Sequence, residues 1–384
     1  MRMSTSQTVG IREGRARLLL TAKHGVQRVF YNPKMSLNRD VAVLFVRSHF
    51  PPWRRLRICD PMAASAVRAV RYVAEAPNVK GVTAADVDPI SVEFAKQMTE
   101  LNDVEEKVLV VQEEANVLLM RHMIDRFDLV DLDPYGSPAP FFENALRATV
   151  AGGVIAATAT DMAPLTGARS TACFRKYGLR PVRTEFAKEM AVRTLAGNLA
   201  ITAAKLKLGI TLAFSHASDH YVRIYVDVAK GKKAANESMR SLEFLKYCPV
   251  CLERSHHSSL NEITPVCNCG GKVLVGGPFW FGLLWNGPTI DRMSASCAMI
   301  ESSRLSELQN LLDKIRCEAR APALYYRVDS LSHVLSIRPP KVSEVLTNLR
   351  EKKFSAVRTH FHPNGFRTDA PHQKVVSAVR DLVV

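Results

Sequence analysis

The chain has 384 residues, of which 47% are hydrophobic and 23% charged, so it can bury a large core, and its length predicts two domains. No window approaches the roughly 18 uncharged apolar residues of a membrane span, and the N-terminus lacks a secretory signal, so we expect a cytoplasmic protein without a membrane partner. A formal net charge of +15 favours a polyanionic partner, with nucleic acid as first candidate and a generally basic proteome as the alternative.

Between about residues 56 and 230, short β-branched runs alternate with helical periods, which is typical of βαβ units on a parallel sheet. The expected strands are LRICD, VKGVTAAD, VLVVQ, FDLVDLD and TVAGGVIAATAT, and the expected helices are 62–75, 90–101, 115–123, 140–147 and 184–206. Two further strands, GITLAFSH and HYVRIYVDV, are joined only by ASD, which is too short for a crossover and predicts an antiparallel hairpin. This α/β layout resembles the class I S-adenosylmethionine-dependent methyltransferase fold, a mostly parallel seven-stranded sheet with a C-terminal antiparallel hairpin.

A polar segment, AKGKKAANES at 229–238, interrupts the pattern and predicts a domain boundary. We expect a methyltransferase domain at 1–237, including an N-terminal segment that contacts substrate and cofactor. Residues 238–384 should form a smaller α+β domain, with a polar helix near 300–319.

Polar residues follow the ends of the first three parallel strands. The first strand ends in Asp60, and the helix after it opens with PMAASAVR instead of a glycine-rich turn; alanines do not readily supply positive φ, so a pyrophosphate cradle is not expected. A ligand carboxylate near Arg68 and the helix N-terminus fits better. Asp86 at the end of the second strand is suited to ribose hydroxyls and is preferred to Asp88, and Glu114 with the Ala115 backbone is suited to an adenine ring. Taken singly, each acid is also compatible with a helix cap.

The fourth strand is followed by Asp133, Pro134, Tyr135 and Gly136, which resemble the Asp-Pro-Pro-Tyr element of enzymes that methylate exocyclic amino groups. An aromatic amine is a poor nucleophile until acceptors take up its proton. Asp133 and the Pro134 carbonyl can be those acceptors, and the proline ring fixes the carbonyl in place. Tyr135 can stack on the base, while the alternative is an Asx turn after a buried strand.

The chain resembles the tRNA (guanine-26, N2)-dimethyltransferase family over nearly its whole length. The stretches that carry the resemblance are REGRARLL, VFYNPKMSLNRD, DLDPYGSP, TATDMAPLTG, SDHYVRIYV, GPFWFG and SAVRTHFHPNGFRTDAP. Tyr135 stands where phenylalanine is common in the family, and AASAVR replaces its more usual Ser-Ala-Thr-Gly-Ile-Arg.

The resemblance implies S-adenosylmethionine as cofactor, tRNA as partner, and one or two methyl groups transferred to N2 of guanine 26. It implies that Arg39 contacts the cofactor, and it gives Arg68, Asp86, Glu114 and Ala115 the contacts described above. Phe30, which otherwise reads as a core aromatic residue, becomes one side of a guanine sandwich completed by Tyr135, and Asp133 hydrogen-bonds the guanine amino group. The alternatives are an adenine amino-methyltransferase and a non-catalytic RNA-binding protein on a methyltransferase scaffold.

Four cysteines, Cys248, Cys251, Cys267 and Cys269, follow the pattern Cys-x2-Cys, fifteen residues, Cys-x-Cys. This spacing predicts a structural, tetrahedral zinc site of the zinc-ribbon type, with free buried cysteines as the alternative. His256 and His257 are expected on the surface. The scattered cysteines are expected in the core; they are Cys59, Cys173, Cys297 and Cys317.

The C-terminal stretch REKKFSAVRTHFHPNGFRTD interleaves basic and aromatic residues. Two interpretations stay open: a surface that grips RNA, or buried phenylalanines under a solvated basic face. The residues concerned are Lys352, Lys353, Phe354, Arg358, Phe361, Phe366 and Arg367.

Overall fold

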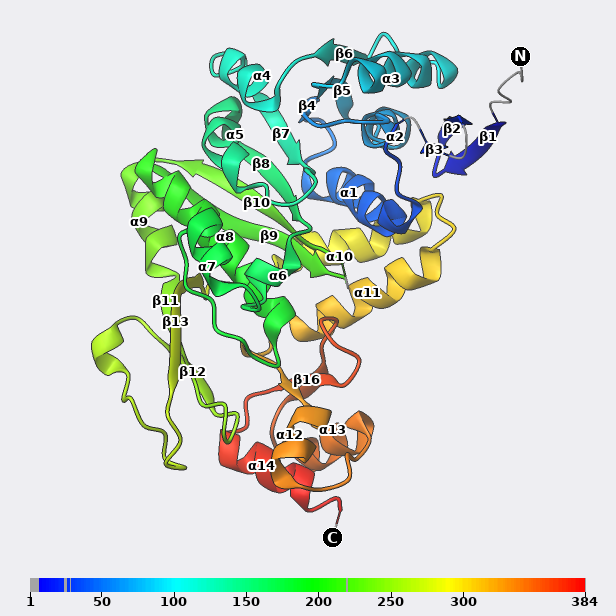
Figure 1. Ribbon diagram of the computed structural model, residues 1–384. Helices are drawn as coiled ribbons and strands as arrows, with labels where there is room; N and C mark the ends of the chain where they lie inside the picture. The colour runs from blue at the N-terminus through cyan, green and yellow to red at the C-terminus, as the bar shows by residue number, and fades with distance from the viewer. Residues whose placement is uncertain (1–6, 24–25, 28, 219, 384) are drawn as a thin grey trace. The chain divides into compact units, whose positions relative to one another are not determined.

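The computed structural model describes residues 7–23, 26–27, 29–218 and 220–383. Asp219 of the SDHYVRIYV stretch lies outside them. The chain divides into two compact units, the first formed by 1–134, 140–157 and 288–312, and the second by 135–139, 158–287 and 313–384. Figure 1 traces their elements. Among the described residues, no helix has both the length and the apolar character needed to cross a bilayer.

The predicted parallel strands all form. They are β4 (Leu56–Asp60), β5 (Val79–Asp86), β6 (Val108–Gln112), β7 (Phe127–Leu132) and β8 (Thr149–Ala159). The predicted hairpin is β9 (Leu208–Ala217) paired antiparallel with β10 (Val222–Lys230). The seven strands follow the order β6-β5-β4-β7-β8-β10-β9 (Figure 1). Near-continuous apolar runs in β4, β7 and β8 are buried, as expected for strands covered on both faces.

The first unit also carries the N-terminal strands and most helices that follow the parallel strands. They are β1 (Gln7–Glu13), β2 (Ala16–Lys23), β3 (Val26–Gln27), α1 (Ser36–His49), α2 (Val67–Glu75), α3 (Pro89–Leu101), α4 (Ala115–Arg121) and α5 (Phe142–Ala148). Helices α2 and α3 pack on β5, and α5 packs on β7. The prediction of a helix from residue 62 is wrong by more than one turn, because residues 61–66 form an irregular loop before α2.

The second unit contains α6 (Met162–Leu165), α7 (Ser170–Tyr177), α8 (Ala187–Lys205) and α9 (Lys232–Arg240). The polar segment 229–238 is therefore the end of β10 and most of α9, not a loop. Helix α9 packs on β9 and α8, because its few apolar residues, such as the buried Ala235, lie on one face.

Two small sheets and five α-helices complete the described structure. The sheet β12-β11-β13 consists of β11 (Leu242–Tyr247), β12 (Arg254–His257) and β13 (Leu274–Trp280). The sheet β14-β16-β15 consists of β14 (Tyr326–Arg327), β15 (Ala356–Arg358) and β16 (Gly365–Thr368). The helices are α10 (Gly287–Ser296), α11 (Leu305–Glu318), α12 (Val328–Leu335), α13 (Val342–Glu351) and α14 (His372–Arg380).

A buried ion-pair network explains much of the C-terminal motif. Arg367 donates to Glu318 at 2.6 Å and pairs with Glu189 at 3.0 Å. Glu318 also accepts from the Thr359 hydroxyl at 2.6 Å and the His360 backbone at 2.8 Å. Burial opposes ionisation of Glu189, but Arg367 and Arg193 outweigh it and lower its pKa to about 2.

The interpretation that the C-terminal stretch forms an RNA-binding surface is therefore wrong for its buried aromatic residues. Phe361, Phe366 and Arg367 are each at most 2% exposed, which agrees with the alternative of buried rings. Lys352, Lys353 and Arg358 are exposed and form the solvated face. The RTHF and RTD motifs serve packing because they supply the partners of two buried carboxylates.

Candidate active site and metal centre

The carboxyl ends of the parallel strands align in the first unit. Asp60 is paired in register with Ala84 of β5, and Asp86 with Gln112 of β6. The Asp86 carboxylate accepts hydrogen bonds from the backbone of Ala64 at 2.9 Å and of Asp88 at 3.0 Å. Asp86 thus ties the loop after β4 to the end of β5, at the edge where open α/β sheets bind ligands.

The loop after β4 adopts left-handed backbone conformations without glycine. Ala64 has φ 45° and Ala66 has φ 54°. Left-handed residues other than glycine cost about 1–2 kcal/mol each, and such strain gathers at ligand-binding loops. The two alanines take positive φ despite this cost, because the hydrogen bond of Ala64 to Asp86 and the burial of Ala66 hold the loop in place.

A buried cluster of charges surrounds Arg68. Its guanidinium donates to Asp133 and, at 2.9 Å, to the Asn38 side chain, and it lies 3.5 Å from Asp131. The Tyr72 hydroxyl donates to Asp131 at 2.5 Å. Since Arg68 is only 4% exposed and Asp131 is fully buried, this ion-pair chain fixes the Asp133 carboxylate at the end of β7.

Asp60 lies inside this charge cluster and is 2% exposed. Burial raises its pKa to about 7, and the neighbouring Asp131 adds to the rise while Arg68 opposes it. A carboxyl that titrates near neutral pH at a sheet edge is a candidate for contact with a cationic ligand.

Arg39 occupies a second buried cluster. Its guanidinium donates to both oxygens of Glu13, at 2.6 and 2.5 Å, and stacks over the Tyr31 ring at 5.1 Å. Arg71 joins the same cluster through Glu13 and Asp40, at 3.0 and 2.7 Å. Arg39 is thus held rigidly by the REGR motif at the start of the chain, and its contact with a cofactor stays a prediction.

The other predicted contacts differ in exposure. Glu114 caps α4, because its side chain accepts from the Val117 backbone at 3.0 Å, and Ala115 is buried beneath it. Phe30 is 64% exposed and Tyr135 is 98% exposed, while Pro134 between Asp133 and Tyr135 is buried. Phe30 is therefore not a core aromatic residue. Both rings are exposed, and their stacking on a base stays a prediction.

Asn38, Asp131 and Glu13 were missed by the sequence reasoning. The sequence contains a feature that marks each of them. Asn38 precedes Arg39 in the NRD motif, and Glu13 lies in the REGR stretch. Asp131 is an acidic residue within an otherwise apolar strand. Buried polar groups of this kind need partners, so each one indicates a network.

The four predicted cysteines converge in the second unit. Their sulfur atoms all lie within 4.8 Å of one another, with Cys248 Sγ 3.5 Å from Cys269 Sγ and Cys251 Sγ 3.6 Å from Cys267 Sγ. These separations are too long for disulfides and close to the roughly 3.8 Å edge of a tetrahedron with Zn–S bonds of about 2.3 Å. The donor set therefore fits zinc.

The other cysteine and histidine predictions are largely confirmed. Cys59, Cys173 and Cys297 are buried, but Cys317 is exposed, so its placement in the core is wrong; it lies on the solvent side of α11. His256 is exposed, pairs with Glu243 at 2.5 Å and stacks on Phe281.

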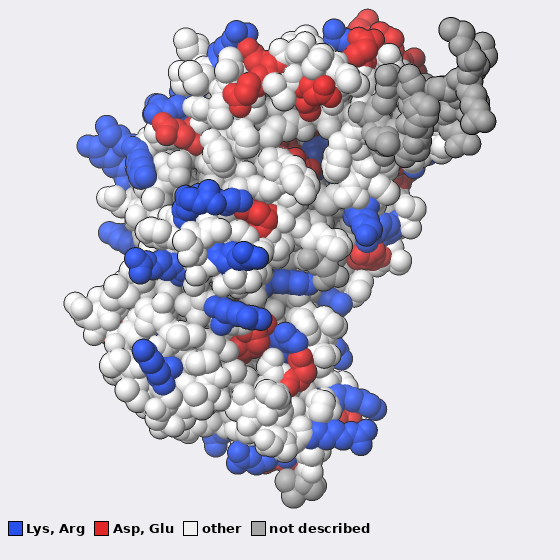
Figure 2. Space-filling view, viewed as in Figure 1, with Lys and Arg blue, Asp and Glu red and all other residues white. Residues whose placement is uncertain are grey.

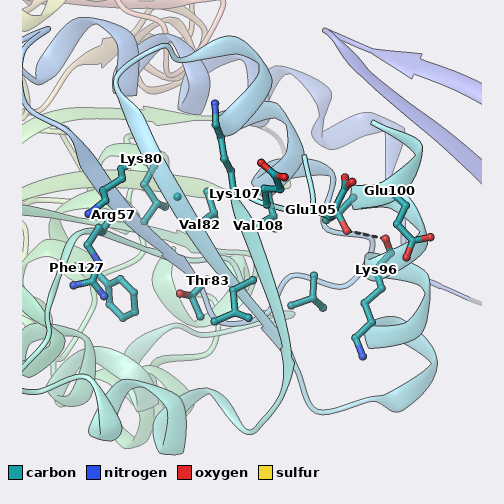
Figure 3. A pocket seen from close by; sticks show the side chains of 16 residues that line it. Arg57, Lys80, Val82, Thr83, Lys96, Glu100, Glu105, Lys107, Val108 and Phe127 are labelled. Carbon is teal, nitrogen blue, oxygen red and sulfur yellow. Dashed lines mark hydrogen bonds between the residues drawn. The ribbon is translucent and has the colours of Figure 1, made fainter. Parts of the chain in front are cut away.

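A cavity of about 460 Å³ lies at the opposite, amino edge of the sheet. Figure 3 shows residues from the beginnings of the parallel strands around it, including Arg57 of β4, Lys80 of β5, Val108 of β6 and Phe127 of β7. Because the predicted cofactor contacts lie at the carboxyl ends of these strands, this cavity is distinct from the predicted site.

The sequence profile of one family, N2,N2-dimethylguanosine tRNA methyltransferase, matches residues 14–380. The chain belongs to this family. A Methanobrevibacter smithii tRNA (guanine(26)-N(2))-dimethyltransferase is 34% identical over 92% of both chains. An Aquifex aeolicus tRNA (guanine(26)-N(2)/guanine(27)-N(2))-dimethyltransferase is 31% identical over 92% of this chain and 90% of the relative.

A solved structure agrees with the family assignment. Trm1 from Pyrococcus horikoshii, in complex with S-adenosyl-L-methionine, matches with a TM-score of 0.88 and 30% identity over 97% of this chain and 99% of that one. With its mostly parallel seven-stranded sheet, the chain has the class I methyltransferase fold.

Proposed function

We infer that this protein transfers methyl groups from S-adenosylmethionine to the exocyclic N2 of guanine 26 in tRNA. The observation that carries the inference is the family match over residues 14–380, together with an Asp-Pro-Tyr element at the end of β7. The net charge of +15 suits a phosphate-rich substrate. A reaction on tRNA also suits a cytoplasmic protein.

The cofactor supplies an electrophilic methyl group. For its contacts we propose Arg39, Asp60, Arg68, Asp86, Glu114 and Ala115. The buried Asn38 amide supports this assignment, because its Nδ2 has no hydrogen-bond partner within the described part of the chain. An unsatisfied buried donor beside Arg68 suits a ligand that brings acceptor oxygens.

The chain's own residues prepare the amine. Asp133, held by Arg68, accepts a hydrogen bond from the guanine amino group and removes its proton as the new bond forms. The Pro134 carbonyl is a second acceptor. Phe30 and Tyr135 would hold the ring between them, which requires that the base first leave its stack in the tRNA.

For residues 238–384 we propose a tRNA-binding domain that contains a zinc-ribbon-like element. Cys248 and Cys251 follow β11, and Cys267 and Cys269 precede β13, so each thiol pair lies on a turn at the end of a small sheet. Zinc would cross-link these turns without taking part in the reaction.

The reaction is tested by mass spectrometry of nucleosides from tRNA incubated with enzyme and labelled cofactor. We expect N2-methylguanosine or N2,N2-dimethylguanosine at position 26, and Asp133→Ala should abolish turnover while tRNA affinity is kept. Recovery of the label in N6-methyladenosine would instead favour the hypothesis of an adenine amino-methyltransferase. If S-adenosylhomocysteine does not bind in calorimetry, both methyltransferase hypotheses are refuted, and a non-catalytic RNA-binding protein is the hypothesis that remains.

A further inference from the structure

The segment between Asp161 and Glu185 is basic throughout. It contains no acidic residue, and its cations are Arg169, Arg175, Lys176, Arg180 and Arg183. All five are exposed. The segment is centred on α7, and Figure 2 shows Lys and Arg gathering on the face where Figure 1 draws that helix.

Most of these cations form no ion pair among the described residues. Lys176 pairs with Asp161 at 2.8 Å. Among the described residues, none of the four arginines has a carboxylate partner. Exposed cations without acidic neighbours raise the local positive potential, which attracts a polyanion.

An aromatic side chain accompanies the charges. Phe174 of α7 is 51% exposed, and the Arg180 guanidinium lies over its ring at 5.2 Å. Covering the exposed part of this ring with a base would remove apolar surface from water, which is favourable. A ring capped by arginine beside further cations is the arrangement that stacks a nucleotide base while phosphates are held nearby.

Hydrogen bonds join α7 to the loop that carries Tyr135. The Gly136 backbone donates to the Thr160 hydroxyl at 2.8 Å and accepts from the Thr160 backbone at 2.9 Å. The next residue, Asp161, accepts from the Tyr177 hydroxyl at 2.6 Å. The basic segment and the predicted base-stacking loop are therefore parts of one bonded structure.

We propose that α7 and its flanking turns bind the RNA backbone next to the flipped guanine, with Phe174 stacking on an adjacent base. This α7 surface consists of Arg169, Phe174, Arg175, Lys176, Arg180 and Arg183. The proposal rests on the proposed function, since it names where the substrate of that reaction is held. It places an RNA contact in the methyltransferase domain in addition to residues 238–384.

The test compares two triple variants with equal loss of charge. R175Q/R180Q/R183Q removes cations of the α7 surface, and K230Q/K232Q/K233Q removes exposed cations at the end of β10 and the start of α9, outside residues 238–384. Affinity for unmodified tRNA is measured by gel shift at several salt concentrations. The α7 variant should bind at least about tenfold more weakly, and its salt slope should fall by about two to three, since each phosphate contact contributes about 0.7–0.9.

The controls separate this surface from general charge and from folding. S-adenosylhomocysteine affinity and thermal melting should stay as in the wild type for both variants. Equal tRNA affinity in the two triple variants would overturn the proposal, because net charge alone would then explain binding. A photo-crosslinking p-benzoylphenylalanine at position 174 should label nucleotides within a few positions of the methylated guanine, and labelling only of a distant arm would also overturn it.

The proposed function fails separately. If the wild-type protein does not methylate guanine 26, that function is refuted, while gel shift and crosslinking still decide whether the α7 surface holds tRNA.

Discussion

Replacing Arg68 by lysine distinguishes two roles for this arginine. The sequence assigns Arg68 to the cofactor carboxylate, whereas in the structure its guanidinium is bound to Asp133, Asn38 and Asp131. Lysine keeps the positive charge that Asp131 needs, but a point charge cannot replace the planar fork that reaches several acceptors. We therefore expect Arg68→Lys to fold and to hold Asp133 poorly.

The size of the effect follows from the contact that is lost. A hydrogen bond between charged groups contributes about 1.5–3 kcal/mol, and each 1.4 kcal/mol of lost transition-state stabilisation slows a reaction about tenfold. Methyl transfer at saturating tRNA and cofactor should thus slow by about 10- to 100-fold. Cofactor affinity reports separately on the contact of Arg68 with the cofactor that is proposed above, whereas the rate at saturation reports on its hold on Asp133.

The assay pairs single-turnover methyl transfer with calorimetry of two ligands. S-adenosylhomocysteine carries the amino-acid carboxylate and 5′-methylthioadenosine lacks it. If Arg68→Lys binds only the first ligand more weakly and reacts at the wild-type rate at saturation, Arg68 serves the cofactor carboxylate, and the reasoning from its contact with Asp133 is refuted.

Four other changes have defined outcomes. Because the pKa of Asp60 is about 7, a cationic cofactor should bind more tightly as pH rises through 7, and its binding should release up to one proton. Calorimetry in buffers of different ionisation enthalpy measures this proton release. Asp60→Asn should remove the pH dependence, and the same pH profile in the variant and the wild type would contradict this role of Asp60. Ala64→Gly should raise the free energy of unfolding by about 1 kcal/mol in denaturant titrations, whereas Ala74→Gly inside α2 should lower it by a similar amount; the same sign for both would argue against strain at Ala64. Folding lowers the pKa of Glu189 from 4.5 to about 2, so this carboxylate should contribute about 3 kcal/mol to the free energy of unfolding above pH 4.5. Denaturant titrations should show this contribution being lost as pH falls toward 2. Glu189→Gln should show no such acid-dependent loss. Cys248→Ser should remove stoichiometric zinc in elemental analysis and lower the melting temperature, and a native protein purified without zinc would refute the metal site.

Much of the architecture could be predicted from the sequence because it depends on local patterns. Strands β4 to β8 and the β9–β10 hairpin follow from apolar runs and a short connection. The four cysteines follow from their spacing, since ligands on two turns converge with little help from the rest of the chain. The acids at the strand ends follow from the shared edge of a parallel sheet. Asp86 ends β5 whereas Asp88 caps α3, and the choice of Asp86 as a cofactor contact stays a prediction.

The partners of these residues were decided only by the tertiary structure. Arg68 reaches Asp133 and Asn38, which are 65 and 30 residues away, and no periodicity encodes such contacts. Ala64 and Ala66 take positive φ because Asp86 and the surrounding packing hold the loop, which overrides the local preference of alanine. A sequence motif states which side chains are present, but burial and partners fix their charge and orientation, and these appear only when distant segments pack together.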